Sequence, residues 1–361
     1  MNLTKKQPPN RKNLHNRSIL RTTLLMATRA SAARTLIVGS GAGTITTYEF
    51  DETANSQGLI KELGATSGSA PAPTWQTIFG NLLYSIGSDK KLIKKGSAKG
   101  VAAPVSIAVG KGGKLVVSAS YGSRGPGPVP DGQEGPPHQA TMDPTGDDII
   151  VPDLRADQVR VYNVNSSTAI KELESIKTPP GFGPRHAFFY PVSKAKATHL
   201  FVVGELSNNI TPFKISYTEG QLKVENIATV STFGKQAVPS GPPAPTAGEQ
   251  PFLTTGNTSI SPTASTKHKP TKPKTPSPPF SVASDAKPKF MQLSASGGLS
   301  TRQYSITKEG NWVAIANSGN SNFSIFRRHP ENGTISSLPI ISTGNDGASC
   351  AIWYEPNAGY C

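Results

Sequence analysis

The sequence predicts an all-β fold built from repeated blades, a β-propeller. The chain of 361 residues contains 35 glycines and 32 prolines, and both residues are too costly inside helices for a helical bundle to hold so many. A pattern of strand, turn, apolar strand, polar turn and alternating strand also recurs along the chain. Two copies begin at His138 and Arg185, 47 residues apart, which is the length of one propeller blade. A β-sandwich, the alternative, has short strands without such a repeat.

Residues 1–33 are predicted to be a basic, disordered leader outside the fold. Residues 1–34 contain eight Lys and Arg residues and no Asp or Glu. Arg21 interrupts the apolar run 19–27, so the segment is a poor secretory signal, and its Arg-rich, acid-poor composition fits a mitochondrial presequence better. We expect a cytoplasmic protein, with mitochondrial or secreted locations as the alternatives.

The propeller domain is predicted to span residues 34–361, and its first unit is a hairpin. The glycines of residues 39–43 suggest a dinucleotide-binding loop, but that motif requires a helix to follow. Residues 44–48 are instead rich in β-branched side chains, which favour a strand. The apolar runs 36–38 and 351–353 lie at opposite ends of the domain, and we expect them to close the ring in one blade or in adjacent blades.

Three blades are expected to be irregular. Residues 84–94 leave little length for outer strands, and the Gly-Pro-Gly-Pro segment 125–128 follows the strand before it almost at once, so two blades are predicted to be truncated. Another is predicted to be interrupted by a disordered Pro/Lys-rich insert over residues 237–289, which holds twelve prolines. Such a composition cannot bury enough apolar surface to offset the entropy of ordering it.

The distribution of charge argues against nucleic acid as a partner. The net charge is +14, but residues 1–34 account for +8 and residues 236–289 for +4, so the body of the chain is close to neutral. No run of about 18 apolar residues predicts a membrane span. The two cysteines and the scattered histidines match no metal-site spacing, so we expect neither a metal nor a cofactor.

Several short motifs, taken in order, resemble one family, the seven-bladed β-propeller lactonases. This family includes the propeller-type 6-phosphogluconolactonases and the fungal 3-carboxy-cis,cis-muconate lactonising enzymes. The motifs are PHQATMDPTG at 137–146, VPDL at 151–154, GPRH at 183–186, VGELSN at 203–208, TRQYS at 301–305 and SCAIW at 349–353.

The resemblance implies seven blades and a cofactor-independent lactonase that hydrolyses a sugar lactone such as 6-phosphogluconolactone. One alternative is a 3-carboxy-cis,cis-muconate cyclase, which consumes no water. Another is a non-catalytic or degenerate propeller that serves as a binding scaffold. The expected partner is a small anionic lactone or carboxymuconate, with neither nucleic acid nor a membrane involved.

The resemblance also implies a catalytic set, which consists of His138, Arg185, Glu205 and Arg302. Arginine pairs with phosphate or carboxylate through two parallel hydrogen bonds, and His or Glu can transfer the proton that ring opening requires. Arg185 and Arg302 are expected to bind the substrate anion. Glu205 either takes part in the chemistry or forms a structural ion pair with Arg185.

Three further residues receive secondary predictions. His186 is a candidate substrate contact, although it should point away from Arg185 because adjacent residues of a strand face opposite sides. Asp153 and Asp157 are interpreted as turn acids that support the blade.

Overall fold

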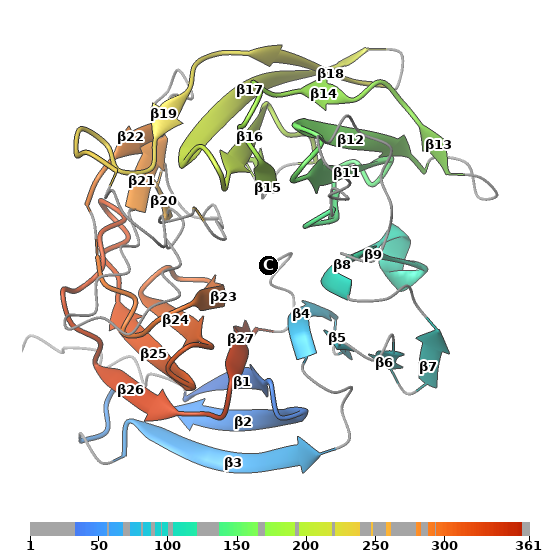
Figure 1. Cartoon of the computed structure of the whole chain (residues 1–361). Helices are drawn as coiled ribbons and strands as arrows, with labels where there is room; N and C mark the ends of the chain where they lie inside the picture. Colours follow the sequence, from blue (N-terminus) through green and yellow to red (C-terminus); the bar gives the residue numbers. More distant parts are fainter. Residues whose placement is uncertain are drawn as a thin grey trace, which may run out of the picture. The chain divides into compact units, whose positions relative to one another are not determined.

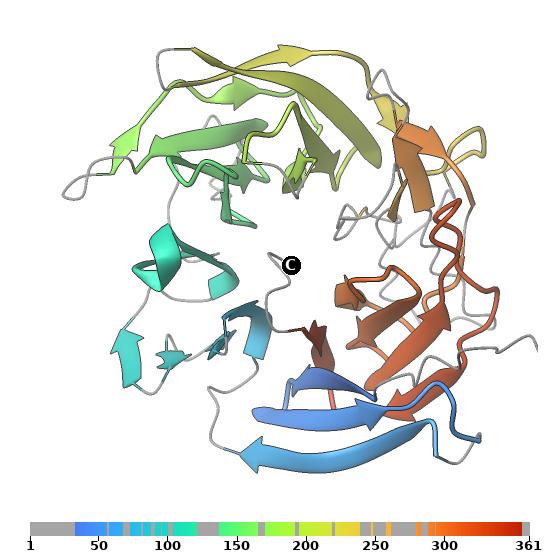
Figure 2. The same ribbon diagram turned by 180° about the vertical axis from the view of Figure 1, so that it is seen from behind.

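A computed structural model describes most of the chain from residue 33 onward. The described residues are 33–55, 58–67, 73–80, 82–87, 91–94, 96–99, 104–120, 137–164, 170–191, 195–218, 221–238, 247, 258–260, 279–282, 288–292 and 294–355. They form seven antiparallel sheets, which we call blades one to seven. Within residues 33–361 the blades follow one another around a common centre, seen from the two sides in Figures 1 and 2.

Blade one joins the two ends of the propeller domain. It consists of β1 (Arg34–Ser40), β2 (Thr44–Phe50), β3 (Ile60–Ser67) and β27 (Ala348–Tyr354), in the order β27-β1-β2-β3. Leu36 lies opposite Trp353, and Val38 lies opposite Ala351. The predicted closure of the ring by the two apolar runs is therefore confirmed.

Blades two and three follow in chain order. Blade two consists of β4 (Pro73–Phe79), β5 (Leu82–Gly87), β6 (Lys91–Lys94) and β7 (Gly96–Lys99). Blade three consists of β8 (Pro104–Gly110) and β9 (Leu115–Ser120), joined by the short 3-10 helix η1 (Lys111–Gly113).

Blades four and five have five strands each. Blade four consists of β10 (Thr141–Met142), β11 (Asp148–Asp153), β12 (Gln158–Asn163), β13 (Lys171–Glu172) and β14 (Ile176–Lys177). Blade five consists of β15 (Pro184–Tyr190), β16 (His199–Gly204), β17 (Asn209–Thr218), β18 (Gln221–Asn226) and β19 (Val230–Ser231).

Blades six and seven complete the ring. Blade six consists of β20 (Thr258–Ile260), β21 (Pro279–Val282) and β22 (Pro288–Phe290). Blade seven consists of β23 (Thr301–Ile306), β24 (Trp312–Asn317), β25 (Asn322–Arg327) and β26 (Ile341–Gly344). No helix among the described residues is long and apolar enough to cross a membrane.

The truncation predicted for two blades is not confirmed. Blade two has four strands, and its outer pair, β6 and β7, is only four residues long in each strand. In blade three the described residues form two strands, and residues 121–136, where the second truncation was predicted, lie outside the described part of the chain. Most of the predicted insert 237–289 also lies outside it, but β20, β21 and the start of β22 fall within that range, and β21 pairs with both β20 and β22. Residues 1–32, which cover almost all of the predicted leader, are outside it as well.

The core lies between neighbouring blades. One apolar cluster joins Trp312 of blade seven to Leu36 and Trp353 of blade one. A second cluster joins Val161 of blade four to Phe213 of blade five. Burial of apolar area between blades is thus what fixes their relative positions, and with them the side chains at the inner strands.

Candidate active site

The inner strands carry a repeated irregularity where the candidate residues lie. In β15 the pairing shifts between Pro184, opposite Gly204, and His186, opposite Val203, so Arg185 is an extra residue in the ladder. In blade seven a similar shift between Thr301 and Tyr304 includes Arg302.

Blade four has the same feature before β10. A bridge pairs Pro137 with Asp153, and the ladder resumes at Thr141 opposite Ile150. Between these points, the three residues that begin with His138 lie opposite only two residues of β11. Such bulges bend a strand and turn a side chain in a new direction. His138 therefore occupies the same irregular position in its blade as Arg185 and Arg302 do in theirs.

His138 is a buried imidazole surrounded by positive charge. It is 5% exposed, and its backbone N–H donates to the carbonyl of Pro152 at 3.0 Å. Burial lowers the pKa of His138 well below 6.5, and the nearby Arg185, His186 and Arg302 lower it further. The imidazole is therefore neutral at pH 7, which leaves a ring nitrogen able to accept a proton.

Arg185 and Glu205 form an ion pair beside it. Nη1 of Arg185 donates to Oε2 of Glu205, and the two side chains are 12% and 17% exposed. Nε of Arg185 is buried, and no hydrogen-bond partner for it exists among the described residues. The ion pair with Arg185, one of the two roles expected for Glu205, is present in the structure.

Arg302 supplies the second guanidinium. Its side chain is exposed, and its Nε donates to Oγ of Ser318 at 3.2 Å. Its positive charge acts on His138, which places it within electrostatic reach of that ring. Exposure leaves the group accessible to a substrate from solvent.

His186 was expected to point away from Arg185, but its side chain lies against the site. Its ring meets that of His138 edge to face, with centroids 4.9 Å apart, and it stacks on Trp75 at 5.7 Å and on Phe188 at 6.2 Å. The alternation of strand side chains fails here because Arg185 occupies the bulge. Sequence reasoning missed Trp75 as a neighbour, although it follows Pro73 by two residues as His186 follows Pro184.

Asp153 and Asp157 both make contacts that support the blade, but only Asp157 lies in a turn, because Asp153 is the last residue of β11. Asp153 is fully buried and accepts a hydrogen bond from Nε of Arg160 at 2.9 Å. The carboxylate of Asp157 accepts from the backbone N–H groups of Gly181 and Gly183 at 2.7 and 2.8 Å.

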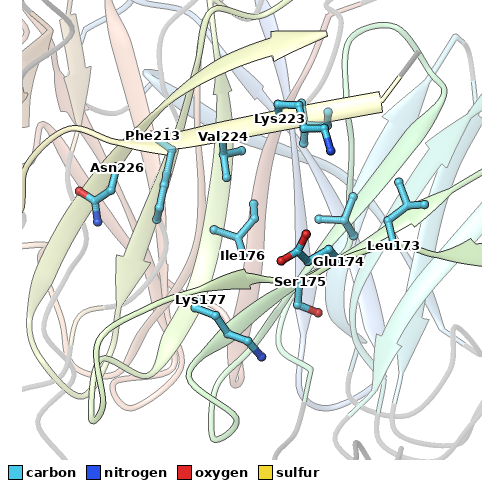
Figure 3. Close-up of a pocket in the computed structure, with 11 residues that line it drawn as sticks. Leu173, Glu174, Ser175, Ile176, Lys177, Phe213, Lys223, Val224 and Asn226 are labelled. Carbon is cyan, nitrogen blue, oxygen red and sulfur yellow. The ribbon is translucent and has the colours of Figure 1, made fainter. Parts of the chain in front are cut away.

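A separate cavity of about 490 Å³ lies between the outer strands of blades four and five (Figure 3). Leu173, Ile176, Phe213 and Val224 give it an apolar lining, and Lys177 and Lys223 are also at its wall. None of the candidate residues lines it, so the chemistry they suggest belongs to the inner strands.

The arrangement of the chain is that of a β-propeller whose inner strand ends bring together one histidine cluster and two arginines. The profile of the family "Lactonase, 7-bladed beta-propeller" matches residues 123–344. A relative from Arthroderma benhamiae, named "Probable 6-phosphogluconolactonase", is 30% identical in an alignment that covers 89% of each chain. The chain belongs to the seven-bladed β-propeller lactonase family.

Other similar proteins match over a shorter part of the chain or at a lower sequence identity. A 6-phosphogluconolactonase of Serratia proteamaculans is 29% identical over 158 residues, which cover 40% of this chain and 46% of that one. The structure resembles the periplasmic gluconolactonase of Pseudomonas aeruginosa, with a TM-score of 0.70, 19% identity and coverage of 90% of this chain and 100% of that one. A protein from Lactobacillus plantarum gives a TM-score of 0.72 at 20% identity over 90% of this chain and 100% of that one. At these identities the structural matches support the fold.

Proposed function

We propose that the chain hydrolyses an anionic sugar lactone such as 6-phosphogluconolactone, with its own side chains as the acid, base and anion-binding groups. The observation that supports this most is that the charges of Arg185 and Arg302 both act on the neutral, buried His138, and that Arg185 is paired with Glu205. A lactone with a phosphate group needs both an anion-binding group and a proton acceptor, and this set contains both.

The arginines would hold and polarise the substrate. Arg302 is exposed, and a guanidinium is a group that can bind a phosphate through two parallel hydrogen bonds. Arg185, whose Nη1 is held by Glu205 and whose side chain is 12% exposed, would polarise the lactone carbonyl oxygen. There it stabilises the negative charge that develops as water adds to the carbonyl carbon.

His138 would transfer the proton. The neutral imidazole accepts a proton from the attacking water as the new C–O bond forms, and a tetrahedral intermediate results. When that intermediate collapses, the ring C–O bond breaks and the imidazolium returns the proton to the leaving alkoxide. Glu205 is engaged by Arg185, so we assign the base to His138 and give Glu205 the task of orienting Arg185.

A comparison of substrates tests this proposal. The purified chain is assayed with 6-phosphogluconolactone, with the unphosphorylated gluconolactone and with 3-carboxy-cis,cis-muconate. We expect faster turnover of the phosphorylated lactone and its loss in His138→Gln, while His329→Gln, a change at a half-exposed histidine of the seventh-blade region, keeps activity. Turnover of the muconate alone would assign the chain to ring closure, and a folded chain inert on all three would favour a binding scaffold.

A further inference from the structure

Asp157 connects two blades through its carboxylate. It ends the turn between β11 and β12 of blade four, in a left-handed conformation with φ of 47°. Oδ2 accepts from the N–H of Gly181 and Oδ1 accepts from the N–H of Gly183, both in the segment that leads into β15 of blade five. Hydrogen bonds to an ionised acceptor are stronger than neutral ones, so this contact fixes the segment firmly.

The fixed segment in turn holds the backbone of Glu205. The carbonyl of Gly183 accepts from the N–H of Glu205 at 2.7 Å, and that of Phe182 accepts from the N–H of Ser207 at 3.2 Å. Gly183 has φ of 63°, and a Cβ there would lie 2.5 Å from Cγ of Leu206. Gly183, two residues before Arg185, and Leu206, next to Glu205, therefore pack closely against each other.

The other side of the same turn leads to His138. Asp153 ends β11, just before the turn, and it bridges to Pro137. The N–H of His138 donates to the carbonyl of Pro152. One hairpin, β11–β12, thus holds the backbone of His138 through the end of β11 and the Arg185–Glu205 segment through Asp157 in the adjoining turn.

We propose that Asp157 is a positioning residue that sets the Arg185–Glu205 pair relative to His138. The inference rests on the proposed function for its effect on turnover, but the placement of the groups can be measured without it. Asp157 touches no reacting atom, and it acts through Gly181 and Gly183.

Asp157→Asn tests the role with little change in shape. Asparagine tolerates the left-handed backbone, but its amide presents one acceptor to two N–H donors. Displacements of about 1 Å at a site can cost on the order of 100-fold in rate, so we expect kcat/KM for 6-phosphogluconolactone to fall by roughly 10- to 100-fold. The matched control is Asp51→Asn in the β2–β3 turn of blade one, whose carboxylate also accepts two hydrogen bonds, both from Thr53. It should leave kcat/KM within about twofold, because surface changes of this kind perturb little beyond their own turn.

A second readout does not need activity. Proton NMR titration of the histidine ring signals follows His138, whose ring faces the charged or titratable groups Arg185, His186 and Arg302. In Asp157→Asn we expect the pKa of His138 to move back toward 6.5, because Arg185 is less firmly held beside it and water enters; Asp51→Asn should not move it. A wild type that is inert on every lactone would defeat the proposed function, yet this shift would still support the positioning role.

Folding is followed by circular dichroism, and Asp157→Gly serves as a second variant that keeps the backbone conformation without the carboxylate. Wild-type kinetics together with an unchanged His138 titration in both variants would overturn the proposal. It would also be overturned if both variants lost their folded spectrum, since Asp157 would then be a residue of stability alone.

Discussion

Replacing Arg185 with lysine separates charge from geometry at the site. Nη1 of Arg185 is held by Glu205, and its Nε is buried without a partner among the described residues. A lysine ammonium can keep the ion pair with Glu205, but it cannot present a second, fixed edge to a substrate. A hydrogen bond between charged groups is worth about 1.5–3 kcal/mol, so loss of the substrate contact should cost about 2–3 kcal/mol. That corresponds to a fall in kcat/KM of roughly 30- to 150-fold.

The assay is initial-rate hydrolysis of 6-phosphogluconolactone, measured above the uncatalysed rate, with folding checked by circular dichroism. The control is Arg327→Lys on β25, where the guanidinium lies 5.7 Å from the centre of the Trp312 ring and is not a candidate residue. Arg327→Lys should retain the wild-type kcat/KM. If Arg185→Lys did so too, the reasoning that the guanidinium geometry matters would be refuted.

Two further predictions concern stability. Burial lowers the pKa of His138 and His186 well below 6.5 in the folded chain, so the unfolded chain binds more protons in acid. The stability that these two neutral histidines contribute is present in full above about pH 6.5 and is lost as the pH falls below it. The urea midpoint of the wild type should therefore be lower at pH 5 than at pH 7, and the difference should be smaller in a His138→Gln/His186→Gln variant. Equal pH dependence of the midpoint in the two proteins would contradict this. Leu36→Ala removes a fully buried side chain at the β1–β27 closure and should cost about 2–5 kcal/mol, whereas Leu338→Ala, at a residue 75% exposed, should stay within about 0.5 kcal/mol. Denaturant titrations that gave the two leucine variants the same stability would argue against a stabilising closure.

The closure of the ring could be predicted from the sequence because its signal is simple. Leu36 and Trp353 belong to apolar runs at the two ends of the domain, and a propeller has to join its ends. The family could also be recognised from the sequence, because the motifs around His138, Arg185 and Arg302 follow one another along the chain in the order that the family shows.

The direction of His186 was not predictable from alternation alone. Alternation assumes a regular ladder, and the extra residue Arg185 breaks it. A weak signal was available, because Pro137 and Pro184 stand just before His138 and Arg185, and proline within sheets favours strand starts and bulges.

The outer strands of blade two were missed because they carry little apolar pattern. β6 and β7 are four residues each and contain lysines, so the sequence resembles a linker there. In blade six, proline content argued against strands, but Pro279 and Pro288 stand at the first positions of β21 and β22, where proline is tolerated.

The central claim, that His138 with Arg185, Glu205 and Arg302 hydrolyses an anionic lactone, is tested most directly by one kinetic comparison. Wild type and His138→Gln are given 6-phosphogluconolactone across pH 5 to 8, and ring opening is followed above the uncatalysed rate. We predict that wild-type kcat/KM stays level below pH 6.5, because the lowered pKa keeps His138 neutral there, and that the variant loses turnover at every pH. A folded wild type that does not accelerate ring opening, or a His138→Gln variant as active as wild type, would contradict the claim.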